Sequence, residues 1–66
     1  MKTYHYRIMG NYQGETKEID DGFSDENVAI HACQQYQLIY KDWEIWVEKQ
    51  TYIDGDLDEC ERVGLN

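Results

Sequence analysis

Two stretches of alternating polarity enclose a helix-start signal, and this order constrains the fold more than any other feature of the chain. Residues 4–9 carry Tyr or Ile at every second position, and residues 43–48 do the same with Trp, Ile and Val. Such alternation of aromatic and β-branched side chains is typical of strands that bury one face. Between them, Ser24 is a good N-cap, and Asp25 and Glu26 would occupy the first helical turn.

The segment after the first strand reads as a hairpin. Gly10 to Gly14 is a glycine-bracketed turn, and 15–20 would be the returning strand. The returning strand has few apolar residues, so we expect it at the edge of the sheet. Alternation would put one set of side chains on one side, Thr16, Glu18 and Asp20, and the other set opposite, Lys17 and Ile19.

The helix should run from the Ser24 cap to about Gln37. Phe23 and Val28 have the spacing of a hydrophobic staple. The i, i+3, i+4 pattern predicts one apolar face, made of Val28, Ala29, Ala32, Cys33 and Tyr36.

The strand at 43–48 should be central and could continue to Ile53, where Asp54-Gly55 signals a turn. The segment 54–66 stays open: one helical turn opened by Asp56 and Glu59, a short strand, or a loosely ordered acidic tail. We therefore predict an α+β fold in a single domain over 1–66. It would be a two-layer ββαβ arrangement, a three- or four-stranded antiparallel sheet with one helix packed on one face.

The charge is strongly acidic and unevenly placed. Fourteen Asp and Glu oppose six Lys and Arg, a net charge of −8 on 66 residues. This field repels nucleic acid and anionic membranes and attracts basic protein surfaces, so we expect a basic protein partner and no direct binding to nucleic acid or membrane. The chain has no apolar run long enough to span a bilayer and no signal-peptide pattern. We expect a cytoplasmic protein whose Cys33 and Cys60 are free thiols.

No arrangement of residues in the sequence predicts chemistry. Asp54, Asp56 and Asp58 resemble a calcium loop, but its sixth position is Glu59 rather than Gly and its twelfth is Leu65 rather than Glu. The two His and two Cys match no common zinc spacing. On a helix, His31 and Cys33 would point to different faces, so they cannot act as a nucleophile and its base. We expect no enzymatic activity, no metal and no cofactor.

The candidate partner-binding residues are the acids without a local structural explanation and one aromatic residue. Trp46 should lie on the sheet face opposite the helix, between two carboxylates. It would be an exposed anchor for a partner, or be covered by Tyr40 or by a terminal segment. The full candidate set is Asp20, Asp21, Glu44, Trp46, Glu48, Asp54, Asp56, Asp58, Glu59 and Glu61.

Residues 4–50 resemble a known family. Two strands, then Asp25-Glu26-Asn27-Val28-Ala29 opening a helix, Tyr36 near its end and Glu44-Ile45-Trp46-Val47 in the next strand are similar to the short inhibitors of bacterial RNA polymerase made by podophages. The resemblance implies a ββαβ phage protein that blocks a host enzyme. That family uses arginines on the strand after the helix, whereas Glu44, Glu48 and Lys49 stand here, so no binding residue is carried over. In composition the chain also resembles small acidic anti-CRISPR and anti-restriction inhibitors.

The hypothesis from sequence is a non-enzymatic, phage-encoded inhibitor in the host cytoplasm. Its acids would steer it onto a basic groove of a nucleic-acid-processing enzyme, such as RNA polymerase, a CRISPR effector or a nuclease, or would imitate DNA phosphates. The alternative is a small homodimeric regulatory or structural module, so both monomer and homodimer stay open.

Overall fold

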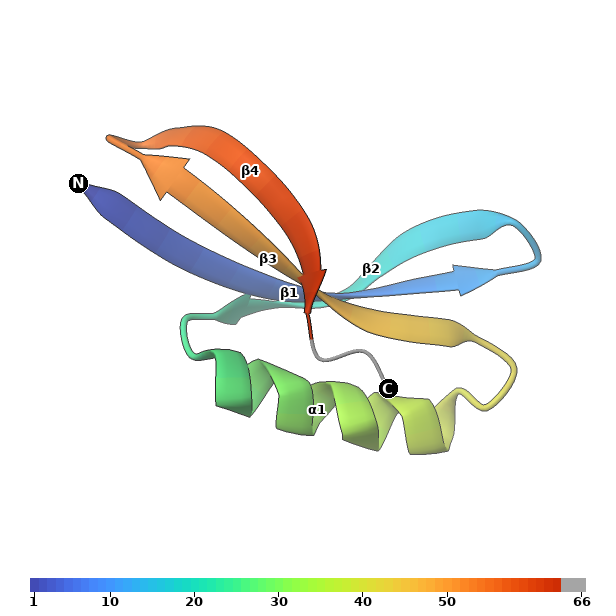
Figure 1. The fold of residues 1–66 in the computed structure, drawn as a ribbon. Helices are drawn as coiled ribbons and strands as arrows, with labels where there is room; N and C mark the ends of the chain where they lie inside the picture. Colours follow the sequence, from blue (N-terminus) through green and yellow to red (C-terminus); the bar gives the residue numbers. More distant parts are fainter. Residues whose placement is uncertain (64–66) are drawn as a thin grey trace.

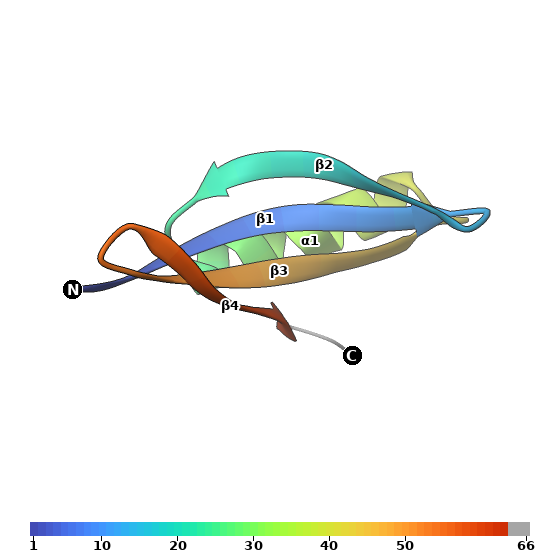
Figure 2. The ribbon, with the colours of Figure 1, turned by 90° about the horizontal axis from the view of Figure 1, so that it is seen from above.

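The computed structural model describes residues 1–63 and consists of one antiparallel sheet and one helix (Figure 1). The elements are β1 (Lys2–Tyr12), β2 (Glu15–Phe23), α1 (Glu26–Ile39), β3 (Glu44–Ile53) and β4 (Asp56–Val63). The strand order is β2-β1-β3-β4, so β2 and β4 form the two edges (Figure 2). The α+β class, the edge position of β2 and the central position of β3 are confirmed, and the segment after the Asp54-Gly55 turn adds a fourth strand.

Both hairpins close with two-residue turns. Gln13 and Gly14 have φ of 53° and 81°, and Asp54 and Gly55 have φ of 50° and 88°. Positive φ at both central residues is the type I′ geometry that matches the twist of paired strands. The predicted turn at Gly10–Gly14 was therefore too long, because β1 continues to Tyr12.

Gly10 is a strand residue because the space above it is already filled. A Cβ atom there would lie 2.6 Å from Ile19 Cδ1, 2.9 Å from Ile45 Cδ1 and 3.0 Å from Trp43 Cε3. Glycine inside a strand often marks such a close approach. In the sequence, a glycine in a strand looks the same as a glycine in a turn, and only the packing around Gly10 distinguishes them.

The helix begins one residue later than predicted. Asp25, not Ser24, is the N-cap, and its carboxylate accepts hydrogen bonds from the backbone N–H groups of Asn27 (2.8 Å) and Val28 (3.2 Å). The predicted staple does not form, since Phe23 packs against the core whereas Val28 is 56% exposed. The helix ends at Ile39 rather than near Gln37.

The core lies between the helix and one face of β1 and β3. Its buried residues come from three elements: Tyr6, Ile8, Ala29, Cys33, Ile45 and Val47. Ile8 and Val47 are paired directly across β1 and β3 and are the largest fully buried side chains. Burial of each contributes about 1.5–3 kcal/mol. Of the predicted helix face, Val28 is excluded, and Ile30 packs against the core instead.

Irregular pairing in β2 changes which side its acids face. Ile8 pairs with Asp20 and Met9 with Glu18, so Ile19 is an extra residue in a β-bulge. Glu18 and Asp20 consequently lie on opposite sides of the sheet, contrary to the simple alternation. The Tyr36 hydroxyl on the helix donates a hydrogen bond to Asp20 Oδ2 at 2.9 Å.

The acidic segment that the sequence left open is strand β4. It pairs with β3 from Asp56 to Val63, with a bulge at Asp58. Residues 64–66 of the expected tail lie outside the described residues. In Figure 1 the tip of the β3–β4 hairpin projects to the upper left, away from the helix. Within residues 1–63, the helix is too short and too polar to cross a membrane.

Candidate functional site

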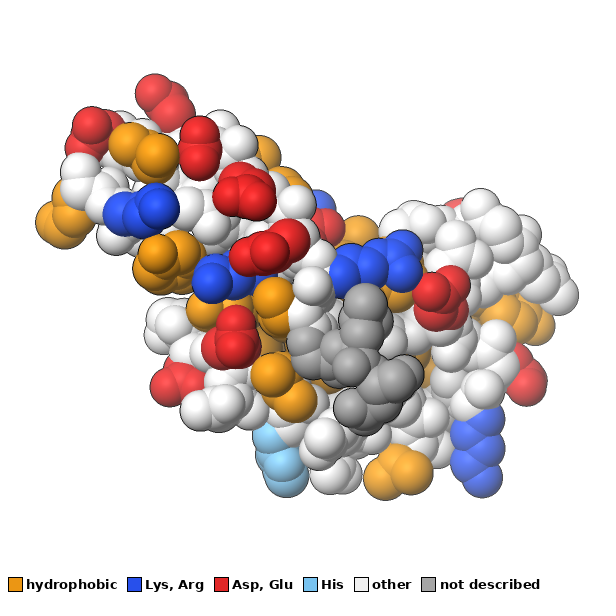
Figure 3. Space-filling model, in the orientation of Figure 1, with side chains coloured by type: hydrophobic (Ala, Val, Ile, Leu, Met, Phe, Trp, Pro, Cys, Tyr) orange, Lys and Arg blue, Asp and Glu red, His pale blue; other side chains and the backbone are white. Residues whose placement is uncertain are grey.

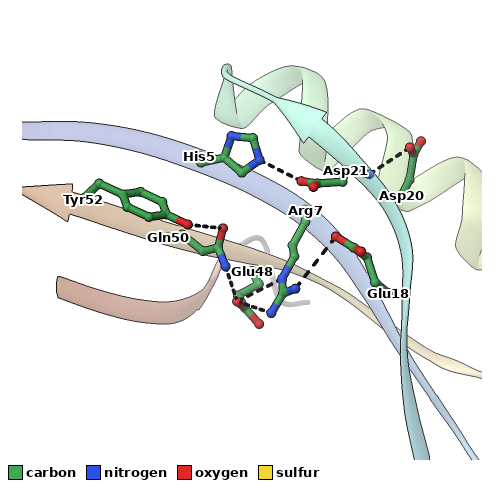
Figure 4. Close-up of polar contacts among 8 residues, drawn as sticks. All are labelled: His5, Arg7, Glu18, Asp20, Asp21, Glu48, Gln50 and Tyr52. Atoms are coloured by element: carbon green, nitrogen blue, oxygen red, sulfur yellow. Dashed lines mark hydrogen bonds and ion pairs between the residues drawn. The ribbon is translucent and has the colours of Figure 1, made fainter. Parts of the chain in front are cut away.

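The sheet face opposite the helix carries a row of connected polar side chains (Figure 4). Arg7 of β1 donates to Glu48 Oε1 of β3 from Nε (3.1 Å) and Nη2 (2.9 Å). Gln50 Nε2 donates to the same oxygen at 3.2 Å, and the Tyr52 hydroxyl donates to Gln50 Oε1 at 3.2 Å. Glu48 is therefore a structural carboxylate that joins two central strands, rather than one that is free for a partner.

The two candidate acids of β2 are also held within the molecule. His5 Nε2 lies 2.7 Å from Asp21 Oδ1. The pKa of Asp21 is lowered, first by a hydrogen bond from the Gly22 backbone and then by His5. Asp20 accepts the Tyr36 hydroxyl, which raises the pKa of that tyrosine. Asp20 and Asp21 lie on the opposite edge strand from the acids of β4, so the candidate acids of β2 and β4 do not form one surface.

Trp46 is buried, not exposed. Only 6% of its surface is accessible, because the Arg62 guanidinium of β4 lies over its ring at 3.9 Å from the centroid. Arg62 Nη1 also donates to Glu44 Oε1 at 3.1 Å. Of the two readings open at the level of sequence, the structure shows cover by the terminal strand, and Trp46 is no exposed anchor. The cation–π contact and the ion pair instead attach β4 to β3.

A shallow hollow of about 220 Å³ opens beside this contact, lined by Trp46, Glu48, Cys60, Glu61 and Arg62. The pKa of the Cys60 thiol is raised, by partial desolvation and by the Glu48 carboxylate beside it. Burial raises the pKa of Cys33 as well. Reactive thiols usually have a lowered pKa, whereas the pKa of both cysteines is raised here.

The remaining candidate acids lie on β4 and its turn. Asp54 pairs with the N-terminal amine, and Glu61 lies 3.9 Å from Lys49. Asp56, Asp58 and Glu59 form no ion pair within the described residues 1–63. We call the four strand residues Asp56, Asp58, Glu59 and Glu61 the acidic edge. Figure 3 shows red side chains gathered along this strand.

The sequence did not predict an aromatic cluster that lies at the end of β3 opposite the β3–β4 turn. Tyr12 stacks on Trp43 at 5.1 Å, Trp43 contacts Tyr40 at 5.5 Å, and Tyr40 stacks on Tyr36 at 6.1 Å between ring centroids. A hollow of about 290 Å³ adjoins this cluster, lined by Lys17, Glu18, Ile19, Tyr40 and Trp43. Tyr12 lies in the stretch 10–14 that the sequence predicts as a turn, so no sequence signal connects it with the other three residues.

No group of three or more His, Cys, Asp or Glu side chains in residues 1–63 is arranged to hold a metal ion. No family model, no curated protein and no solved structure matches this chain. The candidate site therefore depends on the geometry and charge of the chain alone, and its strongest element is the acidic edge.

Proposed function

We propose that this chain is a non-enzymatic binding protein that docks its acidic edge on a basic surface of a protein partner. The observation that carries the proposal is the contrast in charge neutralisation. Most acids elsewhere have a partner: Arg7 forms ion pairs with Glu18 and Glu48, Arg62 forms one with Glu44, and Asp21 lies within hydrogen-bond distance of His5. Asp56, Asp58 and Glu59 stand together on an edge strand, and none of them forms an ion pair with a Lys, Arg or His in the described part of the chain. Such a surface accelerates association with a basic partner.

The partner class we propose is a host nucleic-acid-processing enzyme, and the chain would be a phage-encoded inhibitor of it. A basic groove that binds phosphates is a common intracellular surface complementary to this edge. Four carboxylates over six strand residues give roughly one charge per 5 Å at 3.3 Å per residue. Duplex DNA carries about one per 1.7 Å. The lower density favours electrostatic docking in the groove over close imitation of a duplex.

The homodimer alternative receives less support from the same geometry. Both edge strands carry acids, and an antiparallel pair of β4 strands would bring the carboxylates of two copies together. Like charges on paired strands are destabilising, and charged edges with bulges are a known protection against edge-to-edge association. A monomer at all concentrations in sedimentation would agree with the proposal.

The test is affinity capture from bacterial lysate with the full chain as bait. The variant Asp56→Asn/Asp58→Asn/Glu59→Gln removes the unpaired charges. The control Glu15→Gln/Glu26→Gln/Asp42→Asn removes three acids elsewhere, of which Glu15 and Asp42 are exposed and Glu26 is half-buried. We expect a nucleic-acid-binding enzyme that the native chain and the control retain, that the edge variant loses, and that elutes as salt rises. Equal capture by both variants, or capture indifferent to salt, would refute docking through the edge.

A further inference from the structure

The outer edge of β4 offers backbone hydrogen-bonding groups as well as charge. β4 pairs with β3 on one side only, and no other described strand lies beside it. An edge strand presents a row of unpaired N–H and C=O groups that can template another strand. Every β4 residue from Asp56 to Arg62 is exposed to solvent.

The two edges differ in how accessible they are to an added strand. The helix packs on β1, β2 and β3, and β2 is tied to it through Asp20 and Tyr36. In β4 only Val63 packs against the core. β2 is interrupted by two register shifts, whereas β4 keeps an unbroken register with β3 from Glu59 to Val63. The stretch Glu59–Val63 is therefore the better template for pairing.

We propose that β4 receives an extended segment of the partner as a fifth strand, and that this segment carries Lys or Arg at alternate positions. Side chains alternate along a strand, so Glu59 and Glu61 lie on the same side of the sheet as Val63, and Cys60 and Arg62 lie on the other. A basic residue opposite each glutamate would form a cross-strand pair of opposite charge.

The charges of Glu59 and Glu61 also favour one kind of added strand over the others. A second copy of β4 would oppose acid with acid, and an acidic or neutral segment would gain nothing from Glu59 and Glu61. A basic segment gains backbone hydrogen bonds and charge pairing together, which is the strand-addition mode of peptide recognition. This inference rests on the proposed function and specifies how the partner is bound.

The test uses a fluorescent synthetic peptide with Lys at alternate positions and Val or Thr between them. A second peptide of equal charge has alternate backbone nitrogens methylated, which removes donors without changing side chains. We expect the first peptide to bind the native chain, to shift the amide resonances of Glu59–Val63, and to bind at least roughly tenfold more tightly than the methylated one. Glu59→Lys/Glu61→Lys should abolish binding, whereas the matched charge reversal Glu15→Lys/Glu26→Lys should retain most of it.

The outcomes separate this inference from the proposed function. If both peptides bind the native chain equally and neither binds Glu59→Lys/Glu61→Lys, strand pairing is refuted, whereas docking by charge is not. Capture of a lysate partner without peptide binding, or resonance shifts confined to β2, would also overturn it. If neither the peptides nor any lysate protein binds, both strand pairing and the proposed function are refuted.

Discussion

The two hairpins have the same type of turn but differ in how much their outer strands contribute to the core. β1–β2 and β3–β4 each reverse through two residues of positive φ ending in glycine. The outer strand of the first hairpin supplies Ile19 and Phe23 to the core, whereas the outer strand of the second supplies only Val63. β2 is thus held by burial and β4 by its ladder to β3 and by the Arg62 contacts. A strand that contributes little to the core is free to carry acids without ion-pair partners, as the proposed docking requires.

The largest expected difference comes from truncating an apolar side chain in each outer strand. Phe23→Ala should lower the free energy of unfolding by about 2–4 kcal/mol, because Phe23 packs against the core. Leu57→Ala in β4 should cost less than about 1 kcal/mol, since Leu57 is 53% exposed. Urea denaturation measures both. Equal losses would show that β4 is as integrated as β2 and would break the comparison.

Adding a methyl group at Gly10 should destabilise the first hairpin by about 1–3 kcal/mol through overpacking. The new Cβ would lie within 3.0 Å of Ile19, Ile45 and Trp43. The companion variant Gly10→Ala/Ile19→Val makes room and should recover part of the loss. Thermal melts of the three proteins give the order, and a Gly10→Ala protein as stable as the parent would contradict the packing.

Replacing Gly14 or Gly55 with Ala should lower the free energy of unfolding by about 1–2 kcal/mol, because both glycines have positive φ. The space around them is open, so no steric clash adds to this loss. The location of the damage should differ. Hydrogen exchange should accelerate in β4 alone for Gly55→Ala, and across the sheet for Gly14→Ala, since β2 shares the core. Global exchange in both variants would mean that β4 unfolds only with the whole protein.

Arg62→Ala should remove the cover from Trp46 at a cost of about 1 kcal/mol. The emission of Trp46 should shift to longer wavelength, with stronger acrylamide quenching. Trp43 is the other tryptophan, so the measurement is made in a Trp43→Phe background. Arg62→Lys should preserve part of the cover. Unchanged quenching in Arg62→Ala would show that something other than the guanidinium shields the ring.

The smallest effect concerns Asp21 on the other edge strand, whose carboxylate accepts a hydrogen bond from the Gly22 backbone and lies beside His5. The pKa of Asp21 is lower in the folded state than in the unfolded chain. Its stabilising contribution is therefore complete above the unfolded pKa and is lost as the pH falls through the folded pKa. Asp21→Asn should flatten this acid limb of the stability curve slightly, whereas Asp58→Asn, on β4, should leave it nearly unchanged. Matching curves for the native chain and Asp21→Asn would refute the linkage.

Patterns within short segments predicted much of the fold. Period-two alternation located β1 and β3, and the Asp54-Gly55 dipeptide located the second turn, because both depend on neighbouring residues. The predicted boundaries of the elements were wrong where contacts with distant residues determine the structure. Gly10 is in a strand because Ile19, Ile45 and Trp43 pack over it. The N-cap is Asp25 rather than the predicted Ser24, since either side chain can accept hydrogen bonds from the first N–H groups of the helix.

The candidate site was predicted less well. Acidic residues could be counted, but their partners could not. Glu48, Glu44 and Asp21 proved to be paired with Arg7, Arg62 and His5, each on another strand. Trp46 was assigned to its correct face, yet its burial depends on a residue 16 positions later in the sequence. The aromatic cluster has members from three separate segments and no local signature.

By itself the sequence determined the net charge, the element order and the face that each regular strand residue occupies, because these follow from composition and local periodicity. Tertiary structure decided which acids are neutralised, where the register shifts, and that the acidic segment forms an edge strand. Those outcomes depend on pairing between residues far apart in the chain, and a one-residue bulge is enough to turn Asp20 away from Glu18.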